Sequence, residues 1–199
     1  MLTTTPIRNR LISVKVSTLP TDALITIADA KKYLNVTGSD DDALITRLAD
    51  AAMMTVERLT RRSLLDQQVT TIWSAQALPL RLFRPPVQNI VSVKSIYQGT
   101  KSTAETLTNF YLSGADGMRP KIAFKDTFEF TESNIEEIEI VVACGYGDDP
   151  CYVPDELVQA AYLILNQSYD CRDNYVEGSG TPVPFDAHRL MTPFIVPVI

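Results

Sequence analysis

Residues that bind metals or carry out acid–base catalysis are scarce in this sequence. The 199 residues include one histidine, His188, and three cysteines, Cys144, Cys151 and Cys171, which show no CxxC spacing. A zinc site takes about four such ligands at close spacing, so we expect neither a metal nor a cofactor. The HExxH, GxSxG, GxGxxG and Walker patterns are missing as well. The sequence therefore predicts a protein that is not an enzyme, with free thiols in a reducing cytoplasm.

Long apolar runs and an excess of positive charge are also missing. No stretch reaches the roughly 18 apolar residues of a membrane span, and Arg8 and Arg10 interrupt any run of signal-peptide length at the N-terminus. We therefore expect no membrane partner and synthesis in a cytoplasm. The net charge of −6 disfavours a nucleic-acid-binding surface, which needs clustered Lys and Arg. The charge is uneven, because residues 1–100 carry net +4 and residues 101–170 carry net −9.

Two helices are predicted in the first third of the chain. Thr26 and Asp29 have the spacing of a capping box, which opens a short helix. Asp40, Asp41 and Asp42 place negative charge at the start of the second helix, and we prefer capping over cation binding for them. The second helix carries an apolar stripe at helical spacing, formed by Leu44, Ile45, Leu48, Ala49, Ala52, Val56 and Leu59.

The end of this second helix carries a basic cluster of Arg58, Arg61 and Arg62. In one interpretation the three arginines only complement the negative end of the helix dipole. In the other they meet an acidic region of a neighbouring subunit, and we assign them to a subunit interface. Charges at the edge of a subunit interface affect the register and the association rate of the subunits more than their affinity.

A third helix follows a Gly-Tyr-Gly turn at residues 145–147, and Pro154 suits its first position. It is apolar on almost every side from residue 157 to residue 165. Packing on one core needs only part of such a surface. We therefore expect a second partner, either an inserted domain or another subunit, and we add Tyr162 and Leu163 to the predicted subunit interface.

The middle of the chain reads as strands without intervening helices, which predicts antiparallel pairing. Candidate strands lie at residues 68–74, 80–83, 90–97, 109–112, 121–124 and 137–144. Glu137 and Glu139 share one strand face and are expected to be solvated rather than to form a catalytic carboxylate pair. The predicted class is α+β: a small antiparallel helical bundle with an inserted antiparallel β domain and an extended C-terminal tail.

The expected organisation has five parts. They are an N-terminal arm at residues 1–20, helices at 21–65, the β insertion at 66–147, the returning helix at 148–175 and the tail at 176–199. The first 20 residues are expected to be extended, either as an arm or as an edge strand near residues 11–16. Prolines punctuate the tail, yet it is apolar, with Leu190, Met191, Phe194, Ile195, Val196, Val198 and Ile199. Such a segment docks either on a partner or back over its own β domain.

Several stretches resemble the tailed-phage head–tail connector, or adaptor, protein family. They are ITIADAKKYLNV at residues 25–36, DDDALITRLADAA at 40–52 and LRLFRPPVQNIVSV at 80–93, followed by the landmarks at 145–147, 153–154, 169–174 and 190–197. The resemblance implies a dodecameric ring in the virion neck, docked below the portal protein, that extends the DNA channel and receives a stopper or tail protein. We assign portal binding to the apolar tail residues, from Leu190 to Ile199, named above.

Genomic DNA would pass through the lumen without specific binding, since an acidic wall does not hold phosphates. One alternative function is a stopper or tail-completion protein one layer lower in the neck. The alternative from a different class is a small cytoplasmic enzyme with an unrecognised site.

Overall fold

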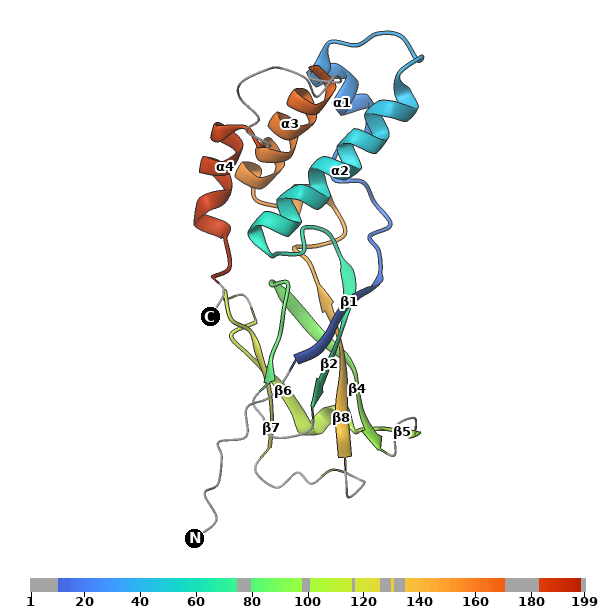
Figure 1. Ribbon diagram of the computed structural model, residues 1–199, viewed down its shortest axis with the longest axis vertical. Coiled ribbons are helices and arrows are strands. Elements are labelled where there is room, and N and C mark those ends of the chain that lie inside the picture. The colour runs from blue at the N-terminus through green and yellow to red at the C-terminus, as the bar shows by residue number, and fades with distance from the viewer. Residues whose placement is uncertain are drawn as a thin grey trace. The chain divides into compact units, whose positions relative to one another are not determined.

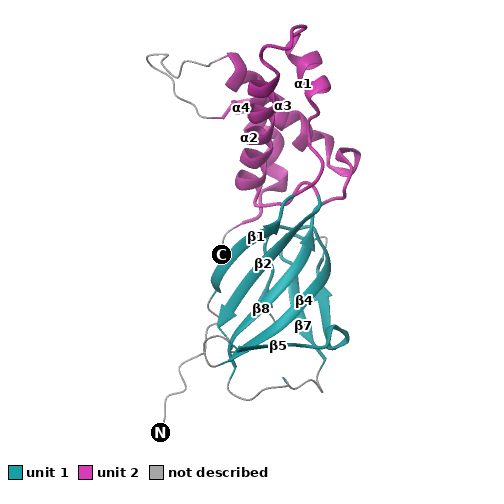
Figure 2. Cartoon of the chain, turned by 90° about the vertical axis from the view of Figure 1, so that its right-hand side faces the viewer, with its two compact units in different colours: residues 1–19, 66–145 teal, residues 20–65, 146–199 magenta. Residues whose placement is uncertain are grey.

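The structure, a computed structural model, confirms the α+β class and divides the chain into two compact units (Figures 1 and 2). It describes residues 11–74, 80–97, 101–115, 117–125, 130, 135–170 and 183–197. Unit 1 contains Met1–Leu19 and Asp66–Gly145, and unit 2 contains Pro20–Leu65 and Tyr146–Ile199. Unit 1 holds the strands, and unit 2 holds the α-helices. The first described residues, 11–18, pair with a strand of the predicted β insertion.

Unit 1 is built from two antiparallel sheets. The larger sheet has the strand order β1-β2-β8-β4-β5, and the smaller has the order β3-β7-β6. The larger sheet comprises β1 (Leu11–Thr18), β2 (Gln67–Ser74), β8 (Ile135–Cys144), β4 (Val87–Tyr97) and β5 (Lys101–Ala104). The smaller sheet comprises β3 (Leu80–Arg81), β7 (Lys121–Phe124) and β6 (Phe110–Ser113), with the 3-10 turn η1 (Leu107–Asn109) before β6. The predicted edge strand near residues 11–16 is β1.

Alternating side chains explain why the two sheets share one core. In β2, Val69, Thr71 and Trp73 are buried while the residues between them are half-buried, as expected for a strand with one face inward. The shared core also includes Val93, Ile138, Ile140 and Val142 from the larger sheet and Leu80, Leu82, Phe110 and Ile122 from the region of the smaller one. Strand β5 is not among the strands that the sequence predicted.

Unit 2 is a bundle of helices around a second core. Its helices are α1 (Ile27–Leu34), α2 (Asp42–Thr60), α3 (Asp155–Asp170) and α4 (Phe185–Met191), with 3-10 turns η2 (Pro150–Tyr152) and η3 (Thr192–Phe194). The predicted capping box of α1 forms in part. The Asp29 N–H donates to Thr26 Oγ1 at 3.2 Å, and Asp29 Oδ2 accepts from the Thr26 hydroxyl at 2.6 Å in place of the Thr26 N–H. Helix α3 contacts α1, α2 and α4, which accounts for much of its apolar surface.

The C-terminal region differs from the extended tail that the sequence predicted. Residues 185–191 form α4, and residues 192–194 form η3. Ala187, Met191 and Phe194 recur at helical spacing on the side that faces the bundle, and Ala187 and Met191 are completely buried. The prolines in this region interrupt the helical signal in the sequence, although Pro184 and Pro193 lie only at the starts of α4 and η3.

Candidate assembly surfaces

The last described residues are held against the end of α2 by hydrogen bonds to their main chain. The Val196 N–H donates to the Thr60 carbonyl at 3.0 Å. Arg61 Nη1 donates to the Val196 carbonyl, and Arg62 Nε donates to the Phe194 carbonyl, both at 2.7 Å. We call this arrangement the C-terminal clasp. It recognises backbone groups, so it fixes the path of residues 194–196 without specifying their side chains.

Arg62 is the central residue of the clasp. It is only 7% exposed, and its side chain also donates a hydrogen bond to the Tyr146 hydroxyl group. Burial raises the pKa of Tyr146, and the charge and hydrogen bond of Arg62 oppose that rise. Nearby, Glu57 Oε1 accepts a hydrogen bond from the buried Leu64 N–H at 2.8 Å. Glu57, Arg61 and Arg62 are therefore engaged in structural contacts within unit 2.

The clasp determines where the predicted portal-binding residues lie. Met191 is fully buried and Val196 is 5% exposed, so neither can be a portal contact without leaving the core. Leu190, Phe194 and Ile195 are half-buried. The remaining two predicted residues, Val198 and Ile199, lie outside the described residues. The predicted set therefore separates into buried supports and residues that remain candidates for partner contact.

The predicted interface residues are also separated by the structure. Arg58 and Arg61 are exposed and Arg62 is buried, and Arg61 and Arg62 donate to the clasp carbonyls. Tyr162 lies against Tyr33 of α1, with ring centroids 4.7 Å apart, and burial raises the pKa of Tyr162. Leu163 is half-buried and packs against the helical core. Their assignment to a subunit interface stays a prediction.

Another exposed surface lies in the loop that leads into α3. We define the acidic loop as residues 146–156, in which Asp148, Asp149, Asp155 and Glu156 are exposed. Tyr152 is 60% exposed and lies over Gly147, where an added Cβ would come within 2.4 Å of its ring. Asp149 Oδ1 accepts a hydrogen bond from the Cys151 N–H at 2.8 Å, which lowers the pKa of Asp149. The loop therefore presents fixed negative charge around an exposed aromatic ring.

The surface of α4 that faces away from the bundle carries an exposed arginine, Arg189, and an exposed carboxylate, Asp186. Phe185 and Arg189 are four residues apart and hence on one side of the helix, and both are exposed. Phe185 is 76% exposed, a large fraction for a phenylalanine. We define the α4 outer face as Phe185, His188 and Arg189. The sequence predicted an extended tail, so this face was not predicted. The four-residue spacing of Phe185 and Arg189 is the sequence feature that indicates it.

The other polar clusters have structural explanations. Asp42 pairs with Lys31 at 2.7 Å, and Asp41 accepts a hydrogen bond from Tyr169 at 2.7 Å, so the acidic run also joins helices to one another. The side chain of Asp41 makes no capping hydrogen bond to α2. Glu139 pairs with Lys94 across β8 and β4 at 3.1 Å. Within the described residues, no group of three or more His, Cys, Asp or Glu side chains could hold a metal ion.

The chain is similar to phage head-tail connector proteins and to chains of gene transfer agent (GTA) particles. Residues 24–84 match the family model of phage gp6-like head-tail connector proteins. A chain in the neck of an empty GTA particle, computed with C6 symmetry, gives a TM-score of 0.79 at 19% identity, covering 94% of this chain and 97% of that chain. A chain in the neck of the native GTA particle, computed with C12 symmetry, gives 0.77 at 18% identity with the same coverage. Comparison with curated proteins gives no match. None of the described helices is long and apolar enough to cross a membrane.

Proposed function

We infer that this chain is a structural head–tail connector of the gp6-like family, and we propose that it forms a dodecameric ring below the portal protein in the virion neck. The observation that carries this conclusion is the agreement between the family match and the fold. The family match covers α1, α2, β2 and β3, and the structural likeness to neck chains covers 94% of the sequence. A connector needs shape and contact surfaces rather than a reaction centre.

The proposed ring extends the DNA channel and receives a stopper or tail protein on its far side. The C6 and C12 symmetries of the matched neck structures support a closed ring of this chain. Heterologous contacts produce such a ring when the rotation between neighbours closes. The net charge of −6 supports passage of DNA without specific binding, because phosphates would not be retained. Arg58 remains a candidate for salt-sensitive subunit contact, since it is exposed.

We propose that the C-terminal end is the portal contact and that the clasp positions it. Met191 and Val196 fix the segment to the core, while Ile195, Val198 and Ile199 provide the apolar side chains for the partner. Each large apolar side chain contributes about 1.5–3 kcal/mol when it docks, before ordering costs. Repetition around a ring multiplies a modest contact through avidity.

Removal of Val198 and Ile199 tests this assignment. Truncation after Pro197 retains the clasp and the buried Met191 and Val196. We expect an unchanged melting temperature and an affinity for purified portal protein at least about tenfold lower, because two apolar contacts are lost. Val91→Ala is the matched control, since it alters an exposed apolar residue of unit 1. Equal portal affinity for the truncated chain and the full chain would show that the contact lies elsewhere.

Catalysis has no place in this proposal. Burial raises the pKa of the Cys144 thiol to about 12, and hydrogen bonding to Asp149 raises the pKa of the Cys151 thiol. Both thiols are therefore poor nucleophiles at neutral pH. A hydrolytic or transferase activity of the purified protein would favour the small-enzyme alternative instead.

A further inference from the structure

Ring closure requires two different surfaces on each copy, and unit 2 carries two that complement each other. The acidic loop presents Asp148 and Asp149 beside Tyr152, and both carboxylates are exposed. No lysine or arginine occurs between Lys125 and Arg172 in the sequence. The hydrogen bond from Cys151 to Asp149 and the contact of Tyr152 with Gly147 hold the loop in one conformation. The loop is therefore preorganised for a basic, aromatic partner.

The α4 outer face has that chemistry. Arg189 supplies a guanidinium that binds carboxylates with directed, often bidentate, hydrogen bonds. Phe185 lies on the same side of the helix and exposes 76% of its surface. Tyr and Phe side chains gain from contact with each other beyond the area that they bury. Residues of these types, Tyr and Arg above all, are enriched among those that dominate protein interfaces.

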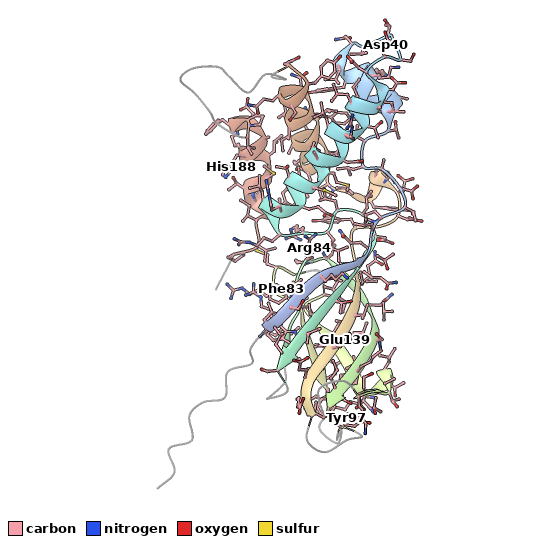
Figure 3. All side chains as sticks on the ribbon, turned by 45° about the vertical axis from the view of Figure 1, so that its right-hand side comes forward. Asp40, Phe83, Arg84, Tyr97, Glu139 and His188 are labelled. Carbon is pink, nitrogen blue, oxygen red and sulfur yellow. The ribbon has the colours of Figure 1, made fainter. Side chains whose placement is uncertain are left out.

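The two surfaces lie on opposite sides of unit 2. In Figure 3, His188 on α4 lies at the left of the helical unit, and the orange segment that carries η2 lies at its right. Within one copy the acidic loop therefore does not cover the α4 outer face. Surfaces on opposite sides of one unit can join copies head to tail, which is the geometry of a heterologous ring.

We propose that the acidic loop of one copy docks on the α4 outer face of the next copy around the ring. This inference rests on the proposed ring and names the contact that closes it. Asp148 and Asp149 pair with Arg189, while Tyr152 packs against Phe185. Asp186 flanks the α4 outer face on the side away from His188, so the carboxylates approach from the His188 side, where no acidic residue of α4 repels them.

Charge exchange between the two surfaces tests the contact. Asp148→Arg and Arg189→Glu each place like charges together, and the double variant restores the opposite pairing. Asp148 is chosen because Asp149 holds the Cys151 N–H. Self-association of the full chain is measured by sedimentation velocity over a concentration series at low and high salt. We expect each single variant to lower the apparent association constant at low salt by at least about tenfold, and the double variant to recover most of that loss.

Two controls separate an interface from a folding defect. Arg47→Glu makes the same charge change at an exposed position of α2 and should leave association unchanged. All variants should retain the wild-type melting temperature, since the altered side chains are exposed. Phe185→Ala and Tyr152→Ala provide an uncharged readout and should weaken association at high salt as well, because apolar contacts are not screened.

The outcomes distinguish this contact from the proposed function. Wild-type protein that stays monomeric at low salt, or a double variant that associates no better than either single variant, overturns the proposed contact. If rings of Arg189→Glu form normally and bind portal protein, the connector function stands and the contact is wrong. If wild-type rings close through this contact but do not bind portal protein, the contact stands and the connector function is wrong.

Discussion

At the residue scale, the structure distinguishes two of the three cysteines, Cys144 and Cys151, which the sequence describes only as free thiols. Cys144 is completely buried at the end of β8, and burial raises its pKa to about 12. Cys151 is exposed in the acidic loop, where a hydrogen bond to Asp149 stabilises the protonated thiol and raises its pKa. Cys171 lies outside the described residues. Solvent exposure and a neighbouring carboxylate therefore separate residues that the sequence treats alike.

This difference predicts the reactivity of the native protein toward a thiol reagent. In a Cys171→Ser background, we expect Cys151 to be labelled slowly at neutral pH and faster as the pH rises toward its raised pKa. Cys144 should stay unlabelled until the protein unfolds. The Asp149→Asn substitution removes the negative charge that favours the protonated thiol, so the pKa of Cys151 falls and its labelling at a given pH becomes faster. Stopped-flow absorbance and mass spectrometry measure the rates and the site. Rates that are equal in both proteins would contradict this account.

Element scale shows how a short helix at the C-terminus is kept in place. Helix α4 has seven residues and is too short to be stable alone in water. Its stability comes from Ala187 and Met191 in the core and from the clasp that follows it. The clasp arginines stabilise the segment through its carbonyl groups, which explains how a proline-rich sequence without a strong helical pattern adopts a fixed path.

The clasp predicts unequal effects for two arginines that are neighbours in the sequence. Arg62→Ala removes a buried charged donor and leaves the Phe194 carbonyl without its hydrogen bond, so we expect the free energy of unfolding to fall by about 1.5–3 kcal/mol. Arg58→Ala alters an exposed side chain and should change it by no more than about 0.5 kcal/mol. Urea denaturation followed by circular dichroism measures both values. Similar losses for the two variants would show that the clasp does not stabilise the fold.

At the scale of the whole molecule, the path of the chain explains why a helical unit can carry a β insertion of this size. The insertion starts and ends at neighbouring positions, because Gln67 in β2 pairs with Cys144 in β8. Immediately outside the insertion, the Tyr146 N–H donates to the Leu64 carbonyl at 3.1 Å. The chain passes between the units at 19/20, 65/66 and 145/146, and the last two points are close together, while each unit keeps its own core. Inserted domains are tolerated where the two connecting segments meet in this way.

This arrangement predicts that the helical unit folds without the insertion. A chain that joins residues 20–65 to residues 146–199 through about three glycine or serine residues spans the distance between paired strands. We expect a helical circular dichroism spectrum and a single cooperative thermal transition, since the buried residues of the helical core are all retained. The full chain, observed at the same wavelength, is the reference. A non-cooperative melt would show that the helices depend on unit 1.

The sequence alone determined the features that depend on local chemistry. Thr26 caps α1 by accepting from the Asp29 N–H, because both residues lie within one turn. Val69, Thr71 and Trp73 form the buried side of β2 because alternate side chains of a strand share a face. The same local patterns, taken in order, were sufficient to identify the α+β class, the β insertion and the resemblance to head–tail connectors. Local periodicity survives in any tertiary context that buries one face.

Tertiary structure alone decided the features that depend on distant partners. Strand β5 exists because β4 supplies its hydrogen bonds, and its own residues, Lys101–Ala104, have no strong strand pattern. Arg61 and Arg62 reach carbonyl groups more than 130 positions away, so no spacing in the sequence could reveal the clasp. The exposure of Phe185 and Tyr152 likewise depends on which faces of α4 and the acidic loop the bundle covers. Hydrogen bonds and burial between distant segments are set by the folded path of the chain, and that path fixed the candidate assembly surfaces.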